Sequence, residues 1–162
     1  MFDNFGELDS YEELNRTAAA LKAEGDIENL KVLAAENGID EMDVVDFVEG
    51  DIDELTTPVT AALGKLAKEK GELKCSEIVG DWVSYIESEI MGSVDVALAV
   101  RRKGKSLIGC IGELLKWSYQ NKYRVDDRII KASGIHASGV EMGIPGMATA
   151  RKLIWGYYGC KS

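Results

Sequence analysis

Only a few residues of this chain have both the type and the spacing that catalysis or metal binding requires. His136 is the single histidine, and acid–base catalysis, a Ser-His pair or a His-containing zinc site would draw on it. It lies in the stretch "SGIHASGV", with no GxSxG or HExxH pattern nearby. We therefore interpret His136 as a loop histidine. Cys75, Cys110 and Cys160 are odd in number and form no CxxC pair, which indicates reduced thiols.

The stretch "GKSLIG" contains Gly104-Lys105-Ser106, which is how a phosphate-binding Walker A loop ends. That loop also needs a glycine five positions before Gly104 and a preceding strand. The residue there is Ala99, and no strand pattern precedes it. The sequence thus predicts no phosphate loop.

The stretch "GDIDELTTP" gathers acidic residues in a way that invites comparison with a calcium loop. An EF-hand counted from Asp51 would need glycine at its sixth position and glutamate at its twelfth. These positions hold Thr56 and Ala62, so the pattern fails. We expect no metal, no cofactor and no catalytic residue, and hence a protein that acts by binding rather than an enzyme.

Two charged clusters remain as candidate binding residues. The first has eight anions and no cation between positions 40 and 54, and it could present negative charge to a basic groove much as phosphates do. The alternative is a solvated acidic face. Its members are Asp40, Glu41, Asp43, Asp46, Glu49, Asp51, Asp53 and Glu54.

The second cluster is basic and directly precedes an apolar helix pattern. Three interpretations stay open: a solvated helix end that complements the helix dipole, a phosphate contact, or a contact with the chain's own acidic part or another protein. No aromatic residue interleaves the cations, which argues against stacking of single-stranded bases. The cations are Arg101, Arg102, Lys103 and Lys105.

The elements that would hold these clusters are helices. Ser10 with Glu13 forms a capping box, Thr57-Pro58 is a strong helix start, and Ser106 can cap a helix. Apolar residues recur at helical spacing through most of the chain, and residues 107–119 read as its most buried helix. We predict an all-α, compact domain of about seven to nine short helices, with a possible small β-hairpin near Ser138-Gly139.

Charge is unevenly distributed along this chain. Its 162 residues carry a formal net charge of −9, of which residues 1–60 contribute −14 and residues 96–162 contribute +8. We predict an acidic helical region over residues 1–56 and a helical core domain over residues 57–162. No apolar run approaches the roughly 20 residues that span a bilayer, and no secretory signal pattern opens the chain. We expect a cytoplasmic protein without membrane contact.

The stretch "VRRKGKSLIGCIGELLKWSYQN" resembles the PcfK-like proteins of conjugative and phage-derived elements, and the type II-A anti-CRISPR proteins that share their domain, a family of Cas9 inhibitors. Lys105, Ser106, Cys110 and Ile111 match one motif of the family. A following short helix matches through Val125, Asp127 and Ile130. The resemblance covers about residues 95–131 and supplies no catalytic residue.

The resemblance implies an accessory protein of a mobile genetic element. We expect an inhibitor that binds a Cas9-type CRISPR effector through residues 40–54 and blocks nucleic-acid binding or cleavage. The alternative is a nucleic-acid-binding accessory protein of a conjugative element that acts through its basic C-terminal third. In that case the four cations of the second cluster would share one surface with Lys122, Arg124 and Arg128.

Overall fold

The computed structural model describes residues 2–160, which form nine α-helices and one small antiparallel sheet, confirming the all-α prediction. Each helix among these residues is too short or too polar to span a bilayer. In chain order the elements are α1 Tyr11–Glu24, α2 Ile27–Glu36, α3 Glu41–Glu49, α4 Pro58–Glu72, α5 Glu77–Gly92, α6 Val94–Arg101, α7 Leu107–Gln120, β1 Tyr123–Arg124, α8 Asp127–Ala132, β2 Glu141–Met142 and α9 Met147–Tyr158.

The helix starts predicted from capping residues are confirmed. The Ser10 hydroxyl accepts the N–H of Glu13, and the Thr57 hydroxyl accepts that of Thr60, with Pro58 at the first helical position. Ser106 accepts the N–H of Gly109 at the start of α7. These caps satisfy donors that a helix terminus would otherwise leave unpaired, which is why they locate the starts so well.

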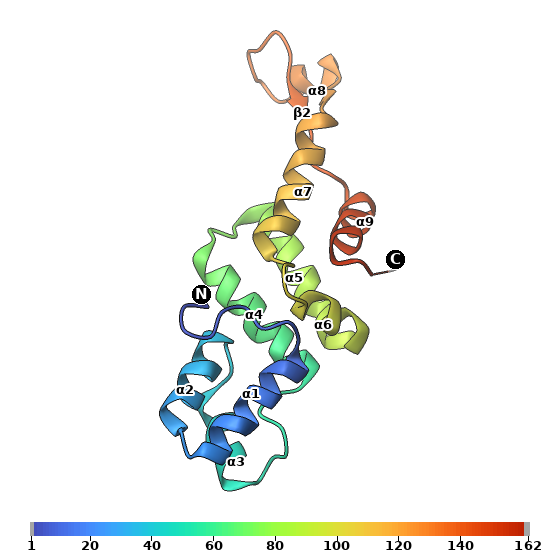
Figure 1. The fold of residues 1–162 in the computed structure, drawn as a ribbon. Coiled ribbons are helices and arrows are strands. Elements are labelled where there is room, and N and C mark those ends of the chain that lie inside the picture. The colour runs from blue at the N-terminus through green and yellow to red at the C-terminus, as the bar shows by residue number, and fades with distance from the viewer. Residues whose placement is uncertain (1, 161–162) are drawn as a thin grey trace.

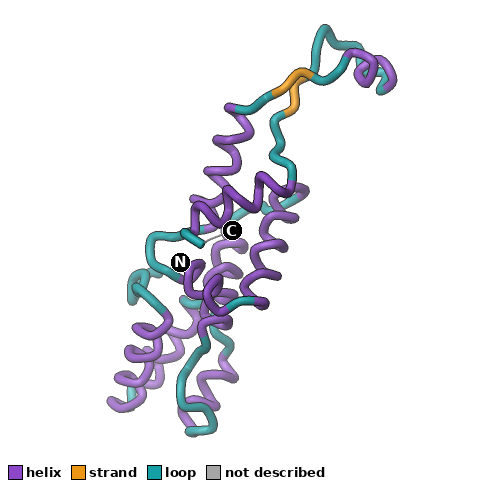
Figure 2. Tube along the Cα trace, turned by 90° about the vertical axis from the view of Figure 1, so that its right-hand side faces the viewer, coloured by secondary structure: helices purple, strands orange, loops and turns teal. Residues whose placement is uncertain are grey.

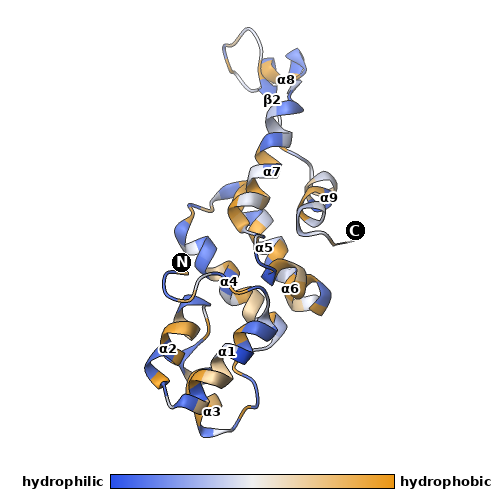
Figure 3. Ribbon diagram, in the orientation of Figure 1, coloured by the Kyte–Doolittle hydropathy of each residue, from blue (hydrophilic) through white to orange (hydrophobic). Residues whose placement is uncertain are grey.

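Two hydrophobic cores fill the molecule, and α4 contributes to both. Helices α1, α2 and α3 enclose the first core, which includes Leu14, Leu33 and Phe47. Helices α5, α6, α7 and α9 enclose the second. Ala61 belongs to the first core, whereas Ala62 and Leu66 belong to the second. Figure 3 shows hydrophobic residues interleaved with hydrophilic ones along α1, α2 and α3, as expected of helices with one buried face.

Two glycines join the two cores by direct backbone contact. Gly38 follows α2 with φ +68°, and Gly64 lies in the middle of α4. A Cβ atom on Gly64 would overlap the carbonyl oxygen of Asn37, and one on Gly38 would overlap the backbone of Gly64. Any larger residue at either position would therefore push the α2–α3 turn away from α4.

Residues 121–146 form an arm that projects from the helical body beyond the end of α7 (Figures 1 and 2). The strands pair Tyr123 with Met142 and Arg124 with Glu141. Helix α8 and the loop after it lie between them, so the β-hairpin is present but is not a tight turn at Ser138-Gly139. We call this segment the arm.

Helix α7 is not the most buried helix, which corrects the prediction made from its composition. Its inner face contributes three buried residues, whereas five residues of α4 are buried. The apolar residues Ile108, Leu115 and Tyr119 face solvent instead. Composition alone does not assign a neighbour to each face of a helix, and α7 has two apolar faces but is packed on only one of them.

Candidate functional site

The acidic residues 40–54 lie together on α3 and on the loop that leads to α4, at one end of the molecule (Figure 1). Asp40 caps α3, because its carboxylate accepts the N–H of Met42 at 2.8 Å. The loop ends at Thr56, whose N–H and carbonyl bond the side chain of Asn15 on α1. Buried Leu55 anchors the same loop in the first core. The C-terminal end of the acidic segment is thus fixed to the body.

We call this region the acidic end. Asp43 and Asp46 are half-buried, and the other six acidic side chains belong to exposed residues. Within the part of the chain that the structure describes, Glu41 alone of the eight forms a salt bridge, at 3.3 Å to Lys31. Seven carboxylates therefore gather without a salt bridge to a base among residues 2–160, which produces a negative field at this end of the molecule.

A broad depression of about 590 Å³ lies within the acidic end. Asp43 reaches it from α3, and Asp53 and Glu54 reach it from the loop. Hydroxyl-bearing residues also line it, namely Thr56, Thr57 and Thr60. Carboxylates and hydroxyls around one shallow hollow suit hydrogen bonds with a cationic side chain of a partner, such as an arginine.

The four cations at residues 101–105 do not form a free basic patch. Arg101 is only 1% exposed; it donates hydrogen bonds to the Leu8 carbonyl and to Oδ1 of Asn37. Lys103 pairs with Asp9 at 2.9 Å. Arg102 is exposed. Two of the four cations, Arg101 and Lys103, thus contact the chain's own N-terminal segment, in line with the intramolecular interpretation.

The remaining cation of this cluster, Lys105, is turned toward α9. Its ammonium group donates a hydrogen bond of 2.6 Å to the Tyr157 carbonyl and lies 4.9 Å from the centre of the Tyr157 ring. The N–H of Ser106 donates to the Tyr157 hydroxyl at 2.9 Å. Lys105 and Ser106, which carry the resemblance noted above, therefore fix α7 to α9.

A buried ion network that the sequence analysis missed lies beneath this turn. Lys65 on α4 is 1% exposed and pairs with Glu7 at 3.2 Å and with Glu69 at 3.7 Å. Its ammonium group also donates to the carbonyl of Lys105. The Glu7 carboxylate accepts the N–H of Gly104, and the Glu69 carboxylate accepts that of Leu107. The network therefore ties the N-terminal segment, α4 and the start of α7 together.

Burial shifts the pKa of two charged groups in this region, Glu69 and Arg101. Desolvation raises the pKa of Glu69, although the nearby Lys65 ammonium and the Leu107 N–H act in the opposite direction. Desolvation also lowers the pKa of Arg101, against the attraction of Glu7, Glu13 and Glu69. A signal for the network was present in the sequence: Lys65 lies among the apolar positions Ala61, Ala62 and Leu66, with Glu69 one turn later.

The seven cations of the nucleic-acid alternative do not form one surface. Residues 101–105 precede α7, whereas Lys122, Arg124 and Arg128 follow it on the arm. A 14-residue helix is about 21 Å long at 1.5 Å per residue. Arg124 and Arg128 also pair with Asp127 at 2.9 Å and Asp126 at 2.7 Å. The positive charge is therefore divided and largely neutralised locally.

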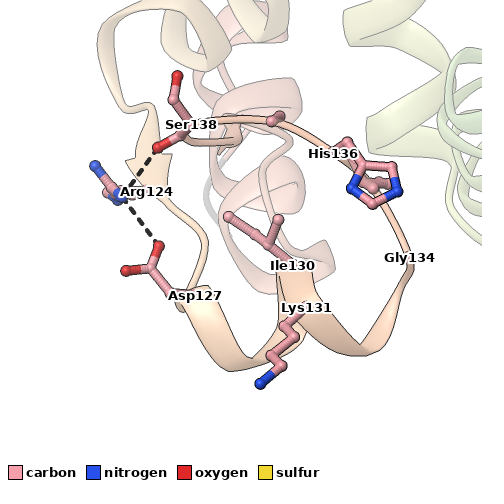
Figure 4. A pocket seen from close by; sticks show the side chains of 9 residues that line it. Arg124, Asp127, Ile130, Lys131, Gly134, His136 and Ser138 are labelled. Atoms are coloured by element: carbon pink, nitrogen blue, oxygen red, sulfur yellow. Dashed lines mark hydrogen bonds and ion pairs between the residues drawn. The ribbon is translucent and has the colours of Figure 1, made fainter.

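His136 borders a surface hollow of about 420 Å³ on the arm (Figure 4). Across this hollow, Arg124 donates hydrogen bonds to Asp127 at 2.9 Å and to the Ser138 carbonyl at 3.3 Å. Figure 4 shows the His136 ring on the side away from this pair. No cysteine lines the hollow. Asp127 and Ser138 line the same hollow, but the Asp127 carboxylate and the Ser138 carbonyl accept hydrogen bonds from Arg124.

In the described part of the chain, the buried Cys110 and the possible metal ligands also fail to form a reactive site. Cys110 is buried in the second core, and burial raises the pKa of its thiol to about 12, so it is a poor nucleophile. Among residues 2–160, no group of three or more histidine, cysteine, aspartate or glutamate side chains could hold a metal ion. The acidic end remains the most distinctive candidate surface.

Comparison with known proteins adds no relative. No protein-family model matches the chain, and no curated protein and no solved structure matches it significantly.

Proposed function

We propose that this protein acts by binding, and that its acidic end docks on a basic surface of a protein partner. The main support for this proposal is the cluster of eight carboxylates within residues 40–54. Among residues 2–160, only one of these carboxylates forms a salt bridge. Such a cluster costs stability through like-charge repulsion. Binding to a cationic surface relieves this repulsion, and complementary charge also speeds association.

The partner in this proposal is a Cas9-type CRISPR effector, and the protein is an inhibitor from a phage or a conjugative element. The resemblance over residues 95–131 supports this choice. The channel of such an effector that holds nucleic acid is positively charged, so a rigid acidic surface can compete there with a phosphate backbone. The half-buried Asp43 and Asp46 and the anchored loop keep the carboxylates in place before binding, which lowers the entropic cost of association.

A cleavage assay tests the proposal with two variants of equal charge. The first neutralises the acidic end by Asp43→Asn, Asp46→Asn, Asp51→Asn and Asp53→Asn. The control neutralises four exposed acids elsewhere, by Glu77→Gln, Asp81→Asn, Asp95→Asn and Glu113→Gln. We expect the wild type and the control to inhibit target cleavage by a purified Cas9, and the first variant to lose inhibition.

The outcomes separate the parts of the proposal. Cleavage that continues unchanged across several Cas9 orthologues at large excess would remove the effector as partner. Equal inhibition by both variants would remove the acidic end as the binding surface. A gel shift of DNA or RNA by the wild type, steeply weakened by salt, would favour the nucleic-acid alternative instead.

A further inference from the structure

Helix α7 carries a second apolar face that its own chain leaves uncovered. Ile108, Leu115 and Tyr119 are 65%, 68% and 74% exposed. With Gly112 they follow the spacing of four, three and four residues that keeps side chains on one side of a helix. We call these four residues the outer stripe. The opposite face packs Leu107, Cys110 and Leu114 into the second core. A helix that is apolar on both sides is normally buried on both sides.

We infer that the outer stripe pairs with the outer stripe of a second copy of this chain, with the two α7 helices antiparallel about a two-fold axis. In such a contact each residue meets its counterpart reciprocally. The spacing of the stripe reads the same in both directions, as this symmetry requires. Ile108 of one copy then opposes Tyr119 of the other, and Gly112 opposes Leu115.

The order of large and small residues suits this register. A Cβ atom on Gly112 would meet nothing within 4 Å, so the stripe has an open notch at that point. Leu115 of the second copy would fill the notch, and the symmetry repeats this contact once more. Alternating large and small residues across facing helices gives interdigitated packing. A self-complementary stripe favours a second copy over an unrelated partner, which would need no such symmetry.

The distribution of charge favours the antiparallel orientation. The net charge of −9 opposes association, but much of the negative charge lies at the acidic end, which is remote from α7 (Figure 1). α7 runs from the body towards the arm, so antiparallel copies hold their acidic ends far apart, whereas parallel copies would bring them together. Beside the outer stripe, Glu113 and Lys116 are 3.9 Å apart and balance each other.

The same antiparallel arrangement can also bury exposed apolar residues of the arm. A stable interface buries about 800 Å² per partner, which is more than three side chains supply. The arm adds exposed apolar residues, namely Tyr123, Ile129, Ile135, Met142 and Ile144. In an antiparallel pair, the arm that follows α7 lies beside the beginning of α7 in the second copy. Exposed Met91, Val94 and Leu98 precede that helix in the chain.

Sedimentation of the full chain tests the inference. We expect a mass of twice 17.7 kDa at micromolar concentration. Gly112→Leu should raise the dissociation constant about tenfold or more, because it fills the notch. It should not lower the thermal stability of the monomer, measured at a concentration where both proteins are dissociated, since the site is open in one copy. Met42→Lys, at an equally exposed apolar residue on α3, should leave the dimer intact. A monomeric wild type, or a dimeric Gly112→Leu, overturns the inference.

Crosslinking tests the orientation. In a background with Cys75→Ser and Cys160→Ser, one sample carries Ile108→Cys and a second carries Tyr119→Cys. Mixing them under mild oxidation should give the mixed disulfide in excess over either homodimer. Homodimeric crosslinks in excess would indicate a parallel or unrelated contact and overturn the antiparallel pairing. The outcome is independent of the cleavage assay, because none of these residues belongs to the acidic end.

Discussion

The ammonium group of Lys65 lies 3.2 Å from a carboxylate oxygen of Glu7, and it lies inside the protein rather than at its surface. This contact links α4 with the segment before α1, two parts of the chain that belong mainly to different cores. The ammonium group also donates to the carbonyl of Lys105 and lies near the carboxylate of Glu69. This network holds the basic turn at residues 101–105 through its backbone, by way of the Lys105 carbonyl and the Gly104 N–H.

Replacing Lys65 with methionine should destabilise the protein by up to about 3–5 kcal/mol, since it keeps the volume but leaves the half-buried carboxylates of Glu7 and Glu69 without their cation. Urea unfolding at neutral pH measures the change. Lys68→Met is the matched control, because Lys68 lies on the same helix and is exposed; it should change stability by no more than about 0.5 kcal/mol. Equal unfolding midpoints for the two variants would contradict the role assigned to the network.

Gly64→Ala should cost about 1–3 kcal/mol or more, because its methyl group would overlap the carbonyl of Asn37 and separate the two cores. Gly71→Ala offers a control on the same helix, where a methyl group meets nothing within 4 Å. There the substitution should stabilise the helix by about 0.5–1 kcal/mol. Thermal melts report both changes, and a Gly64→Ala variant as stable as the wild type would show that the glycine contact is dispensable.

Binding of a Cas9-type effector should slow when Asp43, Asp46, Asp51 and Asp53 are changed to asparagine. Charge steering acts over a Debye length of about 8 Å at physiological salt, so the loss should lie mainly in the association rate and be largest at low salt. The fold should persist, because the change relieves like-charge repulsion. Stopped-flow or surface-binding kinetics at two salt concentrations, beside thermal melts, measure this. If the variant associates at the wild-type rate in low salt, the acidic end is a solvated face and not the binding surface.

Acid should weaken the attachment of the N-terminal segment. Partial burial alone would raise the pKa of Glu36, but its carboxylate accepts the N–H groups of Asn4, Phe5 and Asp3, which lower the pKa below 4.5 overall. A carboxyl group whose pKa is lower in the folded state stabilises the fold above its unfolded pKa and loses that contribution as the pH falls through the folded pKa.

An NMR titration measures this effect. The Glu36 carboxyl signal should titrate with a midpoint below 4.5, and the amide signals of Asn4 and Phe5 should shift with the same midpoint. In Glu36→Gln these coupled amide shifts should disappear. A Glu36 midpoint at or above 4.5 would show that the N–H groups do not hold the carboxylate in solution.

Local sequence patterns were sufficient to predict the helices and the starts of those with capping residues. Ser10, Thr57 and Ser106 form their caps with residues three positions away, and helical periodicity is equally local. The acidic cluster was visible for the same reason: its eight members lie within fifteen consecutive positions, so that their proximity needs no tertiary contact.

The contacts of each helix face and of each charged side chain could not be predicted locally, because they depend on segments that are remote in the sequence. Arg101, expected in a basic patch, is buried because Leu8 and Asn37, from distant parts of the chain, supply its hydrogen-bond acceptors. Ile108 and Leu115 are as apolar as Leu107 and Leu114, yet only the latter pair finds neighbours within the chain. Periodicity shows that a helix has an apolar face, but packing between segments remote in sequence determines whether that face is covered and which buried cation finds its partners.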